Sequence, residues 1–70
     1  MSELGKNIRF YRKSLGKTQK QLAEDLNLAR STVTLYELGR SEPDLKTLGK
    51  IADILDTTID ELAGRIPKNK

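Results

Sequence analysis

Apolar residues at helical spacing, interrupted again and again by residues that end helices, constrain this chain more than any other feature. The first run of such residues is spaced by four, three and four positions and consists of Leu4, Ile8, Tyr11 and Leu15. This spacing is typical of an amphipathic helix, here over residues 3–14, with Gly16 ending it. No stretch alternates apolar and polar residues as a half-buried strand would. The chain is therefore predicted to be all-α, a compact bundle of five short helices.

Two further helices are predicted close together between residues 18 and 39. Thr18 and Gln21 have the spacing of a capping box, which begins a helix of about two turns. Asn27 tolerates the left-handed conformation that ends helices, and helical spacing resumes until Gly39. The core-facing residues of these two helices are predicted to be Leu22, Ala23, Leu26, Val33 and Tyr36.

The last part of the chain predicts two more helices. Pro43 and Asp44 form a turn followed by a capping residue, after which helical spacing continues over residues 45–55. Thr58 and Glu61 form a second capping box, which begins a short final helix. The apolar faces of these helices are predicted to consist of Leu45, Leu48, Ile51, Ala52, Leu55, Ile59, Leu62 and Ala63.

Composition narrows the class of function. The chain has 70 residues, which is room for one domain, predicted over residues 1–66 and followed by a flexible tail at 67–70. It has no Cys and no His, so the common metal ligands, the thiol nucleophile and the near-neutral proton shuttle are absent. We therefore expect no metal, no cofactor and no enzymatic activity. Without disulfides, a signal-like segment or a membrane-spanning apolar run, a cytoplasmic protein is expected.

Charge is distributed unevenly along the chain. Residues 1–40 contain eight Lys or Arg and four Asp or Glu, whereas residues 41–70 contain five and six. A positive first half favours a surface that faces a polyanion. A split of this size also arises by chance, so the charge alone does not choose between the two interpretations.

The two helices between residues 18 and 39 have the spacing of a helix-turn-helix. If Gln19 is counted as the first position, the small Ala23 is the fifth, the turn residue Asn27 is the ninth and Val33 is the fifteenth. The few residues between the helices force a steep crossing, and a small residue at Ala23 lets the second helix approach closely.

Residues 18–55 strongly resemble the phage-repressor-like Xre family of bacterial helix-turn-helix regulators. The resemblance is carried by TQ-xx-LA at residues 18–23, YE-x-GR at 36–40 and P-D-L-x-T-L at 43–48. It implies a five-helix DNA-binding domain, lambda-repressor-like, that acts as a homodimer on a pseudo-palindromic operator of double-stranded DNA. The third helix would lie in the major groove, and the protein would be a transcriptional regulator, most simply a repressor.

Residues at the start and on the outer face of the third helix are predicted to contact DNA bases. Arg30 can form a bidentate pair with guanine, and an aliphatic Leu35 can contact a thymine methyl group. Hydroxyl groups in this segment can bond to a base or to a phosphate. Any one of these side chains is also explained as ordinary surface. The predicted set is Ala29, Arg30, Ser31, Thr34 and Leu35.

A second set is predicted to contact phosphates or to hold the helices in place. Gln19 begins the second helix, where the helix dipole is positive and backbone amides are free to bind an anion. Arg12 and Glu37 are expected to form an ion pair that fixes the third helix against the first, and the resemblance points to the same pair. The predicted phosphate contacts are Arg12, Lys17, Gln19, Lys20, Arg40 and Ser41. Where the family usually has Ser or Thr as the third helix's cap, this chain has Ala29, which predicts a weaker helix start.

The C-terminal part of the chain holds more aliphatic surface than one helix stripe can bury. Ile54, Ile59 and Ile66 are therefore predicted to form a dimer interface. The alternative for Ile59 is that it completes the core of the monomer. At the level of function, the alternative to a DNA-binding regulator is a helical protein-interaction module, as antitoxin-type members of the family bind a toxin.

Overall fold

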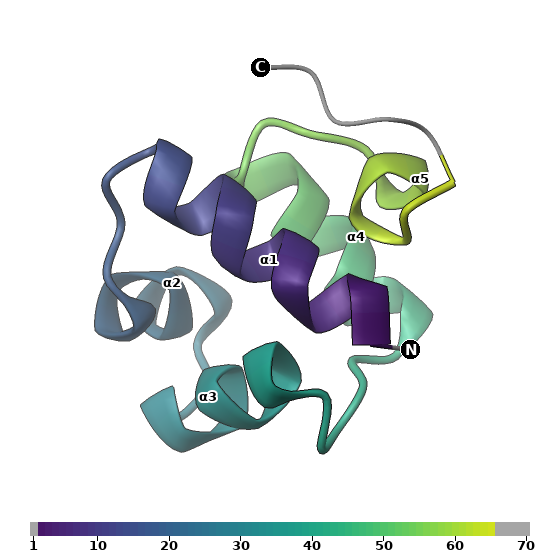
Figure 1. Ribbon diagram of the computed structural model, residues 1–70. Coiled ribbons are helices and arrows are strands. Elements are labelled where there is room, and N and C mark those ends of the chain that lie inside the picture. The colour runs from purple at the N-terminus through teal and green to yellow at the C-terminus, as the bar shows by residue number, and fades with distance from the viewer. Residues whose placement is uncertain (1, 66–70) are drawn as a thin grey trace.

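The computed structural model describes residues 2–65 of the chain. Within this range it contains five helices and no strand, so the predicted all-α fold of five helices is confirmed (Figure 1). Figure 1 shows α1 crossing the middle of the molecule, with α2 and α3 to one side and α5 at the opposite end. The helices are α1 (Ser2–Ser14), α2 (Gln19–Leu26), α3 (Arg30–Leu38), α4 (Leu45–Ile54) and α5 (Ile59–Leu62). The predicted domain end at residue 66 and the tail at 67–70 lie outside the described residues.

The helix boundaries follow from local side-chain chemistry. Both predicted capping boxes form, one from Thr18 and Gln21 at the start of α2 and one from Thr58 and Glu61 at the start of α5. Asn27 ends α2 in the left-handed conformation at φ 58°, and Gly39 ends α3 at φ 77°. These positive φ angles are the ones that Asn and Gly tolerate best.

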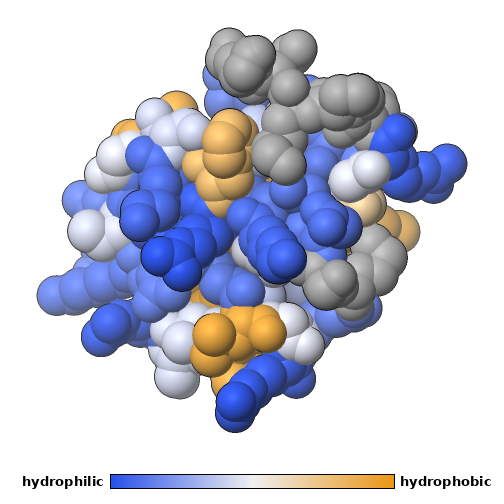
Figure 2. Space-filling view, viewed as in Figure 1, coloured by the Kyte–Doolittle hydropathy of each residue, from blue (hydrophilic) through white to orange (hydrophobic). Residues whose placement is uncertain are grey.

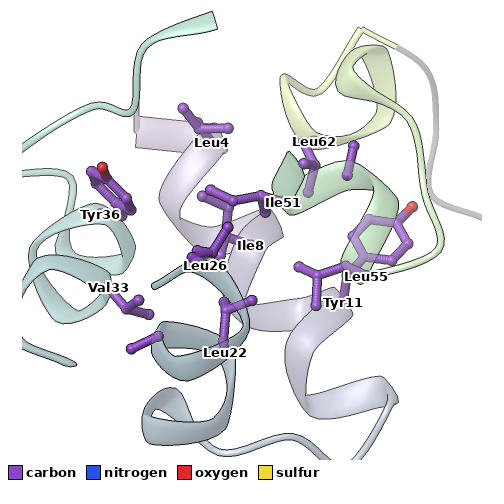
Figure 3. Packing of buried hydrophobic residues seen from close by; sticks show 12 residues of the cluster. Leu4, Ile8, Tyr11, Leu22, Leu26, Val33, Tyr36, Ile51, Leu55 and Leu62 are labelled. Atoms are coloured by element: carbon purple, nitrogen blue, oxygen red, sulfur yellow. The ribbon is translucent and has the colours of Figure 1, made fainter. Parts of the chain in front are cut away.

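The core is formed by one face of each helix (Figure 3). Ile8, Leu22, Val33, Ile51 and Leu62 have no measurable exposure. They come from all five helices, so each helix is held by the others rather than by its own length. The remaining buried apolar residues are Leu4, Tyr11, Ala23, Leu26, Tyr36, Ala52 and Leu55.

Two leucines predicted to face the core are exposed instead. Leu15 is 48% exposed because α1 ends at Ser14 and the chain turns away through Gly16, whose φ is +70°. Leu45 is 73% exposed because it is the first residue of α4. Helical side chains lean toward the preceding turn, and Leu45 has no preceding turn of helix to lie against. Helical spacing alone therefore extends the core stripe one residue too far at each of these helix ends.

α1 and α3 approach each other most closely at Gly5. A Cβ atom at Gly5 would lie 2.5 Å from the carbonyl oxygen of Tyr36 and 2.7 Å from that of Glu37. No side chain fits into this gap. Gly5 therefore lets the backbone of α3 pack directly on α1.

α5 is held to α1 by a buried amide. Asn7 is 1% exposed, and its Nδ2 donates to the carbonyl oxygen of Leu62 at 3.0 Å. That carbonyl lies at the end of α5, where helical carbonyl groups have no partner in their own helix. Asn7 thus supplies a hydrogen bond that the four-residue helix cannot make for itself.

Candidate nucleic-acid interface

The outer face of α3 is open to solvent. Arg30, Ser31 and Leu35 are exposed, and together with the half-buried Thr34 they line a shallow hollow on the surface of α3. On the opposite face, Val33 is 0% and Tyr36 9% exposed. Burial of one face holds the other outward, and no other element among residues 2–65 lines the hollow.

A second hollow adjoins the first and is strongly basic. It is formed by the end of α1, the turn that follows, the beginning of α2 and the first residue of α3. Arg30 belongs to both hollows, so the two surfaces are continuous. The lining residues include five cationic side chains and no acidic one: Arg12, Lys13, Gly16, Lys17, Thr18, Gln19, Lys20 and Arg30.

The beginning of α2 adds backbone donors to this hollow. The capping box satisfies two backbone amides, since Gln21 N donates to the Thr18 hydroxyl at 3.0 Å and Thr18 N donates to the Gln21 side chain at 2.8 Å. The amides of Gln19 and Lys20 lie in the first turn and have no acceptor within their own helix. With the positive end of the helix dipole, they form an arrangement suited to an anion.

Arg12 and Glu37 are brought together below the hollow. Arg12 Nε donates to Glu37 Oε2 at 2.6 Å and Nη2 donates to Oε1 at 3.1 Å, which is a two-pronged guanidinium–carboxylate contact. Nη1 donates to the carbonyl oxygen of Lys17 at 2.8 Å. The two side chains are 10% and 4% exposed. This pair joins α1, the α1–α2 turn and α3 in a nearly dry environment.

Gln19 and Thr34 extend the Arg12–Glu37 pair into a longer network that the sequence analysis missed. Gln19 Nε2 donates to Glu37 Oε1 at 3.0 Å, and Thr34 Oγ1 donates to Gln19 Oε1 at 2.9 Å. The sequence analysis assigned Gln19 to a phosphate and Thr34 to a base, in separate sets. Their spacing of 15 residues would have indicated a contact only once the crossing of α2 and α3 was known.

The other predicted contact residues lie in different surroundings. Lys17, besides lining the hollow, donates from Nζ to Asp25 Oδ2 at 2.9 Å. Ala29 is the N-cap of α3 and makes no side-chain cap, in accord with the weaker helix start. Arg40 and Ser41 are exposed beyond the other end of α3 and do not line the basic hollow.

The residues predicted to form a dimer interface are only partly available. Ile54 and Ile59 pack against the core cluster and are half-buried, and Ile66 lies outside the described residues. The hydrophilic surface in Figure 2 is interrupted by small hydrophobic patches. The most exposed apolar side chains are those of Leu38, at 62%, and Leu45, at 73%. Both leucines flank the α3–α4 loop.

A helix-turn-helix family model matches residues 8–62, which is most of the chain and includes α2, α3 and the residues of the network. The chain belongs to the helix-turn-helix family. The resemblance seen in the sequence, to phage-repressor-like regulators, is confirmed by relatives that carry this name. One is the transcriptional repressor RstR of the cryptic phage CTXphi in Vibrio cholerae, 43% identical over 54 residues, which cover 77% of this chain and 48% of RstR.

Solved structures agree with this assignment. The regulator SinR, solved in complex with DNA, superposes with a TM-score of 0.79 at 30% identity, covering 86% of this chain and 97% of that one. HppE, solved with Fe(II) and substrate, contains the same fold with a TM-score of 0.82 at 29% identity, covering 87% of this chain but only 36% of HppE. The helix-turn-helix unit thus occurs both nearly alone and as part of a larger chain. This chain spans about half the length of the first curated relatives it matches.

Two classes of site find no support among the described residues. Residues 2–65 contain no group of three or more Asp, Glu, His or Cys side chains placed to hold a metal ion. No helix in the described part of the chain is long and apolar enough to cross a membrane.

Proposed function

We propose that this protein is a sequence-specific, double-stranded-DNA-binding transcriptional regulator, acting as a repressor, with α3 in the major groove and no catalytic role. The proposal rests chiefly on one observation: the open face of α3 is continuous with a basic hollow through Arg30. A helix that reads bases needs neighbouring groups that bind phosphates and fix its position on the duplex. Relatives named as transcriptional regulators, and the SinR–DNA complex, support the same role. The role requires the protein to share a compartment with DNA, in accord with the expected cytoplasmic location.

Base recognition is assigned to the exposed side chains of the α3 face. Arg30 reaches a guanine edge through its planar fork, and Ser31 bonds a neighbouring base or phosphate. Leu35 is 41% exposed, and it contacts a thymine methyl group in this arrangement. Ala29, at the N-cap of α3, lies close enough to the helix start to pack on the same bases.

Phosphate binding is assigned to the basic hollow and to the loop beyond α3. Lys17, Lys20 and the first amides of α2 surround one phosphate, with Arg12 at the bottom of the hollow. Arg12 keeps only part of its donor capacity for DNA, because three of its N–H groups bond to Glu37 and to the Lys17 carbonyl. Arg40 and Ser41, on the other side of α3, contact the phosphates across the groove.

A second copy of the chain is part of the proposal. A two-fold dimer places two α3 helices about 34 Å apart, one turn of DNA, so that both contact the same side of an operator. Ile54 and Ile59 expose part of their surface, and Leu45 lies on the same half of the molecule. These side chains, with Ile66, are the proposed contacts between the two copies.

The salt dependence of DNA binding tests the proposal. With four or five phosphates contacted per half-site, log affinity against log salt falls with a slope of about −7 to −9 for the dimer, measured by fluorescence anisotropy. In the double variant Lys17→Gln/Lys20→Gln the slope becomes shallower by about 1 for each phosphate that a lysine no longer neutralises. The matched control Lys50→Gln/Arg65→Gln removes two exposed cations outside the hollow and leaves the slope unchanged. A flat salt response of the unaltered chain refutes DNA binding.

A further inference from the structure

The hydroxyl group of Thr34 is committed inside the protein. Its Oγ1 lies 2.9 Å from Gln19 Oε1 and 3.2 Å from the carbonyl oxygen of Arg30, and both of these atoms only accept hydrogen bonds. A threonine hydroxyl has a single proton. Thr34 therefore has no proton left to donate to a base while it bonds to Gln19, even though it lines the open hollow on α3.

The side-chain amide of Gln19 is oriented from both ends. Its nitrogen donates to the Glu37 carboxylate at 3.0 Å, and its oxygen accepts from Thr34 at 2.9 Å. A reversed amide would turn its oxygen toward a carboxylate and lose the bond to Glu37. Glu37 is itself fixed by the two-pronged contact with Arg12. The three neighbours together leave the amide one favourable orientation.

This orientation leaves one donor of Gln19 unused by the network. An amide nitrogen carries two N–H groups, and one of them bonds to Glu37. Gln19 lines the basic hollow, beside Lys17, Lys20 and Arg30. We propose that Thr34 is a positioning residue that holds the Gln19 amide ready to donate its second N–H to a DNA phosphate, and that Thr34 does not read a base. The inference rests on the proposed DNA-binding function.

One variant separates positioning from base reading. Thr34→Val keeps the shape of the side chain and removes the hydroxyl donor. The full chain is titrated against two probes, a short random-sequence duplex and a duplex selected from a random library. A phosphate contact is present on both, so Thr34→Val weakens both by the same factor, about fivefold per half-site. The base preference at each position and the salt slope stay unchanged, because the amide that is displaced carries no net charge. Thr34→Ser restores the affinity.

A second background and a neighbouring variant sharpen the test. In a Gln19→Ala background, Thr34→Val has no further effect on affinity, because the group that it positions is gone. Ser31→Ala, on the same face of α3, is the matched control and weakens only the selected duplex.

Two results overturn the inference. In the first, Thr34→Val weakens only the selected duplex and relaxes the preference at one base. In the second, it binds both probes as tightly as the unaltered chain does. An unaltered chain that binds neither duplex refutes the proposed function instead.

Discussion

The α1–α3 half of the molecule and the α4–α5 half use their polar side chains differently. In the first half, polar contacts cross between helices: Arg12 bonds to Glu37 over 25 residues of sequence, and Thr34 bonds to Gln19 over 15. In the second half they stay local, as in Asp44 with Thr47 and Thr58 with Glu61, three residues apart. The cross-helix contacts fix the angle between α2 and α3, on which the proposed recognition depends. The local ones only begin helices that support it.

The largest effect expected from this difference is on stability, at Glu37. Glu37→Ala removes the partner of a nearly dry Arg12 and one acceptor of Gln19. Leaving a buried charge unpaired costs about 3 to 5 kcal/mol, which is most of the stability of a small domain. Urea unfolding measures the loss. Leu35→Ala, on the open face of α3, lowers the midpoint far less, and an equal shift for both variants would contradict the importance of the pair.

The two helical glycines provide the next comparison. At Gly5 an added Cβ would meet the Tyr36 carbonyl oxygen at 2.5 Å, whereas at Gly49 the nearest atom is Ile59 Cδ1 at 4.0 Å. Gly5→Ala therefore forces α1 and α3 apart and costs about 2 to 3 kcal/mol. Gly49→Ala stabilises by up to about 1 kcal/mol, because Ala favours the helix and has room. Thermal unfolding of the two variants gives shifts of opposite sign, and two shifts of the same sign would show that the close approach at Gly5 is unimportant.

Local features of the fold could be predicted from the sequence, and contacts between distant residues could not. The capping boxes at Thr18 and Thr58 and the left-handed end at Asn27 depend on residues within a few positions of one another, so spacing predicts them. Gly5 and Asn7 act on residues far along the chain, and nothing near them in sequence marks that role.

The candidate site shows the same limit of sequence reasoning. That Arg30, Ser31 and Leu35 lie on one open face follows from helical spacing opposite Val33. That Thr34 is bonded to Gln19 follows only from how α2 and α3 cross. Sequence reasoning therefore identifies the residues of a site more readily than the bonds between them.

A smaller effect is expected at Tyr11, at the side of the core where α1 faces Leu55 (Figure 3). The Tyr11 hydroxyl is buried and has no hydrogen-bond partner among the described residues. A buried polar group without a partner costs free energy, so Tyr11→Phe stabilises the protein by about 1 kcal/mol in urea unfolding. Tyr36→Phe is the matched control on α3. A loss of stability in Tyr11→Phe would mean that its hydroxyl has a partner in solution.

The smallest effect concerns pH and belongs to the α4–α5 half. Hydrogen bonds from the Thr57 side chain, and then from Thr58, lower the pKa of Glu61 below its usual 4.5. Bonds from Thr47 lower the pKa of Asp44 below 3.8. A carboxyl group with a lowered folded pKa stabilises the fold above its unfolded pKa, and this stabilisation is lost as pH falls through the folded value.

Glu61→Gln tests this assignment. It keeps the capping-box spacing but removes the charge, so it destabilises the protein slightly at pH 7, and the difference disappears near pH 3. Urea unfolding at both pH values measures it. Thr57→Val removes the main cause of the shift, and an NMR titration then finds the Glu61 pKa closer to 4.5. A Glu61→Gln penalty that is the same at both pH values would mean that the carboxylate charge does not stabilise the start of α5, and that the α4–α5 half is held by its apolar contacts alone.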